Sequence, residues 1–334
     1  MESSVAPPPP EPPKAAPSHG KAPTEAVEGS ATWSPLDRLG LAFCWALGLL
    51  FCAIAVAITV YLFLQGIEFL QLDQLTTPAA TGFTETETGG FSDAFIGTLM
   101  VAAMGIALAL PTGVAIAVWL VEYGRPAPLA RVTELTIEAI AGIPSIVLAL
   151  FGTVIFSSTA LGFLSRSNEG VVFGRSFFAA AAMLSRVALP LIVASTRQGL
   201  ESIPRHVREA SYAVGKTKAA TVRRILLPTA RPQVATGTIL GLGRIIGDTA
   251  IILVLLGATQ NFAPVEGAPF PLDYLRGAGT TLTNFVYEAS PTGNLNQPQK
   301  AYAAAFVLLL MVLGLNAAAD LVHRRARKAG TWSH

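Results

Sequence analysis

The sequence predicts an all-α membrane protein with six transmembrane helices. Of its 334 residues, 52% are hydrophobic and only 13% are charged, whereas soluble domains carry about 25% charged residues. Long uncharged runs recur along the chain, and a helix of about 20 such residues crosses the roughly 30 Å of bilayer hydrocarbon. Basic residues gather in alternate connections between the runs, as in multi-pass proteins. No segment shows the alternating polarity of a membrane β-barrel strand.

Four of the predicted spans carry no charge, and the other two are interrupted by ions. The uncharged runs are residues 39–67, 94–121, 139–165 and 301–319. The fourth and fifth spans in chain order are residues 176–196, with Arg186, and residues 233–258, with Arg244 and Asp248. Prolines within the spans remove backbone hydrogen bonds and predict kinks or breaks. These prolines are Pro111, Pro144 and Pro190.

The chain is predicted to have four parts. Residues 1–35, which contain "PPPPEPP", form a Pro-rich tail that cannot bury enough apolar surface to fold and is expected to be disordered. Residues 36–94 hold the first transmembrane helix and an external loop. Residues 95–325 form a compact five-helix unit that contains the basic connection 197–231. Residues 326–334 form a basic C-terminal tail.

The distribution of Lys and Arg predicts the orientation in the membrane. The connection 197–231 carries eight Lys or Arg residues, whereas residues 68–93 carry five acids and no base. Residues 259–299 contain only one base, Arg276. Because basic loops stay in the cytoplasm, six spans put both termini and the 197–231 connection on the cytoplasmic side.

A Gly-Lys-Thr triplet at residues 215–217 raises the question of nucleotide binding. A phosphate-binding P-loop also needs a glycine five residues before the second one, and position 210 is Ala210. The preceding residues are charged and helix-like, so no P-loop is predicted. The pattern instead predicts two short helices. Gly215 ends the first, residues 218–226 form the second, and Pro228 stops it before the next span. Such a pair suits docking into a groove on another protein, or a solvated connector.

The same connection carries the residues of a known signature. In this signature Glu-Ala-Ala is followed by Gly after three residues and, nine residues later, by Ile-x-Leu-Pro. The matching residues are Glu209, Ala210, Ser211, Gly215, Ile225, Leu227 and Pro228. The match resembles the EAA motif of ABC importer permeases, with Ser211 in place of the second Ala. The resemblance implies a type I ABC importer permease fold, in which this region is the coupling segment seated on a separate ATPase subunit.

Further segments are similar to the permeases of the phosphate importer, in particular the PstA type. They are residues 120–152, 203–232 and 237–250. The resemblance implies a transport subunit that is no enzyme and binds no cofactor itself, with ATP and Mg on the partner ATPase. It also implies four kinds of partner: an ATP-binding subunit dimer, a second permease of the PstC type, an extracytoplasmic phosphate-binding protein, and membrane lipid. The slight positive charge gives no reason to expect nucleic acid.

The charges inside the spans are the candidate substrate path. Arg244 and Asp248 stand four residues apart on one helix face, and they form either a private ion pair or part of an anion route in which Arg244 grips phosphate. Arg186 either snorkels, pairs with Asp248 across helices, or lies on the route. The family usually has Gly-Glu-Thr-Ala-Pro where this chain has Gly247-Asp248-Thr249-Ala250-Ile251, so an expected kink loses its proline.

Two Gly-x-x-x-Gly spacings surround these charges and permit close helix packing. They are Gly237 with Gly241 and Gly243 with Gly247, and they pack either against a partner permease or within the chain. Two other functions stay open at this point. One is an ABC importer permease for another oxyanion, such as sulfate or molybdate. The other is an ion-coupled secondary transporter that uses Arg244 and Asp248.

Overall fold

The computed structural model describes most of the chain outside its N-terminal region. The described residues are 34–77, 89–124, 126–158, 160–161, 164, 174–257 and 275–330. Contacts divide the chain into residues 1–58 and residues 59–334, and each part is described by itself. Of the predicted Pro-rich tail 1–35, only residues 34 and 35 are described.

The first part contains the beginning of helix α1 (Pro35–Phe69). Ser34 and Asp37 cap this helix reciprocally. The Ser34 backbone N–H and hydroxyl donate to an Asp37 carboxylate oxygen at 3.1 and 2.7 Å, and the Asp37 N–H donates to the Ser34 hydroxyl at 3.2 Å. Such a box satisfies N–H groups that lack an intrahelical partner. The side chains from Pro35 to Ile58 are exposed within this part and almost all uncharged, as expected of a helix in lipid.

The second part is built of helices, and its described residues contain no strand. Several helices are short, and two five-residue stretches have π-helical geometry. In chain order the elements after α1 are η2 (Leu72–Leu75), α2 (Ser92–Val118), the π-helical η3 (Trp119–Tyr123), α3 (Ala127–Gly142), α4 (Ser145–Phe156), α5 (Phe177–Glu201), α6 (Arg205–Ala213), α7 (Lys218–Thr221), the π-helical η5 (Val222–Leu226), α8 (Leu227–Gly247), α9 (Thr249–Leu256), α11 (Leu282–Ala289) and α12 (Pro298–Gly330).

Up to six of these elements can cross a membrane, which agrees with the predicted six spans. Four single helices are long and apolar enough: α1, α2 with η3, α5, and the first part of α12. Two bent pairs supply the others. Helices α3 and α4 meet at 106°, and the helix from Lys218 to Gly247 meets α9 at 55°.

The prediction of a single third span over residues 139–165 is wrong. Helix α3 already begins at Ala127, and the chain turns sharply at Ile143 before α4 starts at Ser145. Pro144 explains the turn, because proline disfavours the helical conformation of the residue before it, and Ile143 is extended with ψ 128°. The charged residues of α3 hid it from a search for uncharged runs. One of them, Glu134, forms an ion pair with Arg197 of α5 at 2.6 Å.

Of the three prolines predicted to kink or break spans, only Pro144 lies at a break. Pro111 and Pro190 lie inside the continuous helices α2 and α5. Neither helix ends within a turn of its proline.

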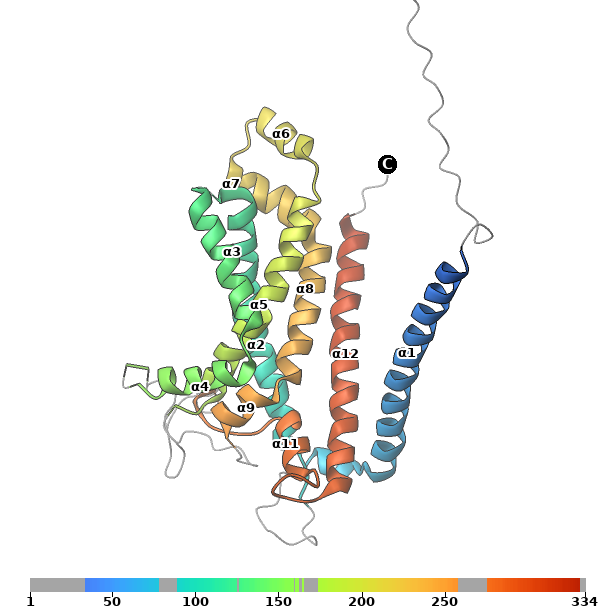
Figure 1. The fold of residues 1–334 in the computed structure, drawn as a ribbon. Coiled ribbons are helices and arrows are strands. Elements are labelled where there is room, and N and C mark those ends of the chain that lie inside the picture. The colour runs from blue at the N-terminus through green and yellow to red at the C-terminus, as the bar shows by residue number, and fades with distance from the viewer. Residues whose placement is uncertain are drawn as a thin grey trace, which may run out of the picture. The chain divides into compact units, whose positions relative to one another are not determined.

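Helices α2, α5 and α8 pack along one another in the centre of the second part (Figure 1). Small residues allow this close approach: a Cβ on Gly105 of α2 would lie 2.9 Å from Ile245 of α8, and one on Gly113 would lie 2.7 Å from Ile192 of α5. Helices α6 and α7 lie at one end of this bundle, called here the α6 end, and α4, α9 and α11 lie at the other.

Beside this centre, the end of α1 packs on α12. Tyr61 and Phe63 meet Tyr302 and Phe306 edge to face, with ring centroids 6.0 and 5.3 Å apart.

Candidate functional site

The predicted break at Gly215 is confirmed, and its geometry is specific. Helix α6 ends at Ala213, and Gly215 takes a positive φ of 76°. Its N–H donates to the Tyr212 carbonyl at 2.9 Å, and the Lys216 N–H donates to the Ser211 carbonyl at 3.2 Å. These two hydrogen bonds form a Schellman motif. The motif needs a residue in the left-handed conformation, which glycine adopts with the least strain. The Gly-Lys-Thr triplet is therefore the end of a helix, with no P-loop strand before it.

Thr217 has a role that the sequence reading did not give it. Its hydroxyl accepts a hydrogen bond from the Ala220 N–H at 3.3 Å and caps the start of α7. Threonine is a preferred residue at this position, because the first N–H groups of a helix have no partner within it. The triplet thus contains the C-terminal stop of α6 and the N-terminal cap of α7.

The first three signature residues divide between the surface and the interior. Glu209 and Ala210 are exposed on α6, and Glu209 has no hydrogen bond or ion pair within the described residues. Ser211 is only 4% exposed, and its hydroxyl lies 2.8 Å from the Thr221 hydroxyl of α7. The serine that departs from the family pattern therefore joins the two short helices, which alanine could not do.

The last three signature residues lie where α7 leads into α8. Ile225 is half-buried in the π-helical η5, and Leu227 and Pro228 form the half-buried first positions of α8. The expectation that Pro228 stops the helix is wrong, because the chain stays helical from Lys218 to Gly247. A proline ring clashes with the carbonyl four residues earlier. The wider π turn directly before Pro228 relieves that clash, and the Leu227 N–H bonds to Val222, five residues back.

Arg208 has contacts that the sequence alone did not indicate. Its Nε donates to Glu122 at the end of η3, with an N–O distance of 2.9 Å. Its two terminal nitrogens donate to the carbonyls of Ile203 and Leu200, at 2.6 and 2.8 Å. The side chains of Arg208 and Glu122 are 17% and 6% exposed. One guanidinium thus joins α6 to the ends of α2 and α5. The one signal for Arg208 in the sequence is its position directly before Glu209 of the signature.

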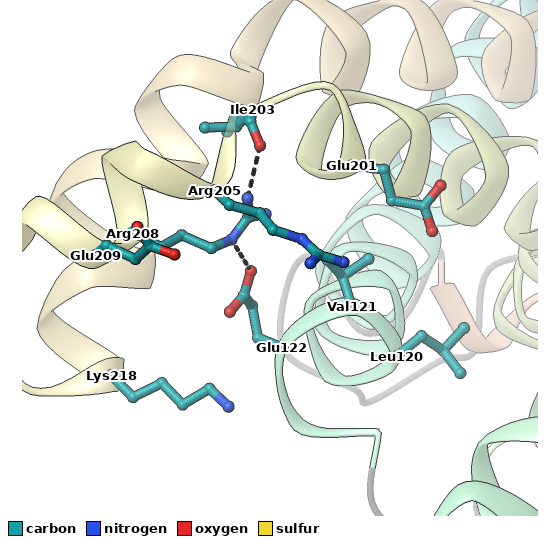
Figure 2. Close-up of a pocket in the computed structure, with 9 residues that line it drawn as sticks. All are labelled: Leu120, Val121, Glu122, Glu201, Ile203, Arg205, Arg208, Glu209 and Lys218. Carbon is teal, nitrogen blue, oxygen red and sulfur yellow. Dashed lines mark hydrogen bonds and ion pairs between the residues drawn. The ribbon is translucent and has the colours of Figure 1, made fainter. Parts of the chain in front are cut away.

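Lys218 of α7 is a second cation that contacts the turn at the end of α2. The Lys218 ammonium lies 4.7 Å from the centre of the Tyr123 ring, within the range of a cation–π interaction. These contacts border a pocket of about 570 Å³ between α6, α7 and the ends of α2 and α5 (Figure 2). Its lining combines the apolar Leu120, Val121 and Ile203 with acids and bases, including Arg205 and Glu201.

Within α8 the predicted pair of Arg244 and Asp248 is present but loose. The nearest nitrogen and oxygen are 4.0 Å apart, the Arg244 side chain is 53% exposed and the Asp248 side chain 3% exposed. Asp248 has another role: its Oδ1 accepts from the Ile251 N–H at 3.0 Å and caps α9. The helix therefore breaks at Asp248, without the proline that the family usually has three residues later.

Arg186 forms no pair with Asp248 within the described residues. It lies exposed on α5, and its Nη1 donates to the Ala182 carbonyl of its own helix at 2.5 Å. Of the open readings for Arg186, the structure therefore does not support the pairing with Asp248.

The two glycine pairs of α8 lie on different sides of the helix. Gly237 and Gly241 are buried against α5, where a Cβ on Gly237 would lie 2.9 Å from Ser195 and 3.1 Å from the Ile192 backbone. Among the described residues, no neighbouring atom lies within 4 Å of such a Cβ on Gly243 or Gly247. The first pair packs within the chain, and the second lies on the open side of α8 that also carries Arg244.

No group of three or more His, Cys, Asp or Glu side chains is placed to hold a metal ion in the part of the chain that the structure describes.

Curated relatives cover most of the chain. It is 35% identical over 243 residues to "Phosphate transport system permease protein PstA 1" of Mycobacterium tuberculosis (strain ATCC 25618 / H37Rv), covering 71% of each chain. It is 37% identical over 234 residues to the PstA protein of Mycobacterium leprae (strain TN), covering 70% of each. The PstC protein of the same organism is 28% identical over 250 residues, covering 70% of this chain and 75% of its own.

Solved structures share the fold at low sequence identity. A bacterial alginate ABC transporter chain superposes with a TM-score of 0.59 at 16% identity, covering 86% of this chain and 95% of its own. A chain of the inward-facing methionine transporter MetNI gives a TM-score of 0.52 at 20% identity, covering 71% and 94%. These similarities concern the fold alone.

Residues 109–328 match the family described as "Binding-protein-dependent transport system inner membrane component". This range contains η3, the charges of α8, and residues 205–221, which are called here the α6–α7 segment. The chain therefore belongs to the binding-protein-dependent transport system inner membrane component family.

Proposed function

We propose that this chain is the PstA-type membrane subunit of an ATP-driven importer that moves inorganic phosphate into the cell. The observation that carries the proposal is the 35–37% identity to mycobacterial PstA proteins over about 70% of each chain. The family is one of transport-system membrane components, so the chain is a multi-pass inner-membrane transport subunit and not an enzyme.

The α6–α7 segment is the proposed docking site for a separate ATP-binding subunit, one copy of a dimer that holds ATP and Mg. Glu209 and Gly215 are exposed, and Glu209 has no bond within the described residues, so both are accessible to a partner. The concentration of Lys and Arg in residues 197–231 supports a cytoplasmic location for this segment and for both termini.

A second permease of the PstC type is the proposed cover for the open side of α8. An arginine in a membrane span costs about 2.5–3.5 kcal/mol on insertion scales, yet the Arg244 side chain is 53% exposed. Gly243, Gly247 and the half-exposed Leu240 leave room beside it for close approach of another helix. A face of this kind is suited to protein or to a water-filled path, and poorly suited to lipid.

The proposed mechanism is alternating access. Closure of the ATPase dimer would displace the α6–α7 segment and reorient the helices, so that a path open to an external phosphate-binding protein opens to the cytoplasm instead. The Arg244 guanidinium has only the 4.0 Å contact with Asp248 among the described residues, and this planar group can donate two parallel hydrogen bonds to phosphate oxygens. Asp248 limits its movement, and Arg186 adds positive charge on the adjacent helix α5.

The test is reconstitution of the chain in lipid vesicles with its second permease, ATPase and binding protein. We expect uptake of radioactive phosphate into the vesicles. This uptake should require ATP enclosed in the vesicles and the binding protein in the outside medium. Competition by excess sulfate or molybdate, with direct uptake of either, would instead assign the chain to an importer of another oxyanion. Uptake driven by an ion gradient through the purified chain alone would contradict an ABC importer altogether.

A further inference from the structure

The two short helices of the α6–α7 segment each place a cation on the same turn of α2. Arg208 of α6 is paired with Glu122 at 2.9 Å, and Lys218 of α7 lies over the Tyr123 ring at 4.7 Å. Glu122 and Tyr123 are the last two residues of the π-helical η3. These four residues are called here the α2 clamp, and the close-up shows Arg208 and Lys218 reaching the end of α2 from separate helices (Figure 2).

The α2 clamp matters because α2 is not continuous in sequence with the α6–α7 segment. The segment follows α5 and leads directly into α8, so any displacement of it acts on those two helices through the backbone. At the α6 end, α2 can follow only through non-covalent contacts, and the Arg208–Glu122 pair joins residues 86 positions apart. Farther along the bundle, α2 packs closely on both α5 and α8.

The junction at the α6 end combines apolar packing with the polar contacts of the α2 clamp. A buried apolar cluster that includes Ala117 of α2, Leu200 of α5 and Leu226 of η5 packs part of this junction. Beside it, a pocket of about 570 Å³ lies between α6, α7 and the ends of α2 and α5. Within the junction, the Arg208 guanidinium satisfies Glu122 and two carbonyls at the end of α5. Charge-assisted hydrogen bonds of this kind are directional and about twice as strong as neutral ones.

The helix geometry is irregular at the clamp and close to it. The two π-helical turns of the described chain, η3 and η5, lie at the end of α2 and at the junction of α7 with α8. Such turns are rare, and they occur frequently at functional sites.

From these observations we infer that Arg208 is a positioning residue for coupling. Through Glu122, and with Lys218 on Tyr123, it makes α2 move together with α5 and α8 when the ATPase displaces the α6–α7 segment. Removal of the clamp would let the segment move without α2, so that ATP is hydrolysed with little transport. The inference rests on the proposed function of the segment as the ATPase docking site.

The experiment compares R208Q and E122Q with the wild-type chain in the complete reconstituted transporter. ATPase association, ATP hydrolysis and phosphate uptake are measured on the same vesicles, and the result is the uptake per ATP hydrolysed. We expect both variants to retain association and hydrolysis while this ratio falls, by about tenfold for R208Q and by less for E122Q, within the 5–150-fold range typical of coupling between sites.

The controls separate coupling from loss of structure. R131Q removes an exposed arginine of α3 that has no partner within the described residues, and its ratio should equal that of the wild type. E122Q keeps the size of the side chain and an acceptor oxygen, so it decides the matter if R208Q does not assemble. A wild-type ratio in every variant that assembles, or a loss of uptake strictly proportional to the loss of hydrolysis, would overturn the inference.

The outcomes for the clamp and for the proposed function are distinct. If the wild-type complex imports another oxyanion and not phosphate, the substrate assignment fails, and the ratio is measured with that anion. If the wild-type complex neither binds the ATPase nor uses ATP, the proposed function and the inference fail together. If it imports phosphate while both variants keep its ratio, only the clamp is rejected.

Discussion

Two arginine–carboxylate pairs of this chain are built in opposite ways. Arg208 and Glu122 are 86 residues apart in sequence, 2.9 Å apart in space, and 17% and 6% exposed. Arg244 and Asp248 are four residues apart on one helix, yet their nearest atoms are 4.0 Å apart and the Arg244 side chain is 53% exposed. Closeness in sequence is therefore a poor guide to which pair is tight.

The difference indicates what each arginine is for. The Arg208 guanidinium has all its described partners inside the chain, where it joins three helices. Within the described residues the Arg244 guanidinium has one contact, the 4.0 Å approach to Asp248, and one oxygen of Asp248 accepts from the Ile251 N–H. The first arginine is thus expected to matter for the chain itself and the second for what the chain contacts.

The largest effect on stability is expected from R208A. It leaves Glu122 buried without its cation, and breaking a buried ion pair costs about 3–5 kcal/mol. We expect the lower end, about 3 kcal/mol, because both residues border the pocket. Thermal unfolding of the detergent-purified chain measures it. R244A is the matched variant, and its unfolding should change by less than about 0.5 kcal/mol although phosphate uptake is lost. Equal destabilisation by both would remove the contrast.

The glycines of α8 test the same contrast between an inner and an open side. G237V inserts a side chain that would meet Ser195 and the Ile192 backbone, and overpacking of this kind costs about 1–3 kcal/mol. G243V meets open space, so the isolated chain should unfold as the wild type does, while co-purification with the second permease should decrease. Normal assembly of G243V would show that the open side of α8 is not the permease contact.

A smaller effect is expected when α9 loses its Asp248 cap. D248A removes the acceptor of the Ile251 N–H, and the loss of an N-cap costs about 1 kcal/mol. D248N keeps a capping oxygen and removes the charge, so its stability should stay close to that of the wild type. If D248N is as unstable as D248A in thermal unfolding, the ion pair with Arg244 contributes more than its 4.0 Å separation suggests.

The smallest effect is expected for S211A. The variant removes the hydroxyl pair with Thr221, and one such hydrogen bond contributes about 0.5–1.5 kcal/mol. Thr221 keeps its bond to the Thr217 carbonyl, which favours the lower half of that range. Comparison of S211T, which keeps the hydroxyl in a larger side chain, with S211A, which removes it, separates the effect of the hydroxyl from that of side-chain size. An unfolding temperature of S211A equal to the wild type would show that the pair adds nothing.

Much of this fold follows from local sequence signals. Apolar runs, four of them uncharged, predicted six spans, and up to six elements of the structure can cross a membrane. Gly215 predicted the end of α6 because few other residues take a positive φ. The Asp248 cap was also readable in principle. An acid directly before the apolar run Thr249–Leu256 is a typical helix start, but the charge drew attention to pairing instead.

Other features depend on contacts that a single sequence does not reveal. Helix α3 was missed because it carries Arg131, Glu134 and Glu138, and it can do so partly because Glu134 meets Arg197 of α5. The partner of Arg208 is 86 residues distant, so only the folded chain brings them together. The assignment of Pro228 as a helix stop failed because a π turn absorbs the ring clash, and nothing in the local pattern predicts that turn.

The Schellman turn at Gly215 has a mechanical consequence for the segment that contains it. Two backbone bonds, the Thr217 cap and the hydroxyl pair of Ser211 with Thr221 together fix the connection between α6 and α7. Few backbone torsions remain free there, so the helix pair is stiff in spite of its exposed surface. A force applied to α6 is then transmitted to α7 and α8 with little local deformation, which a flexible loop of the same length could not do.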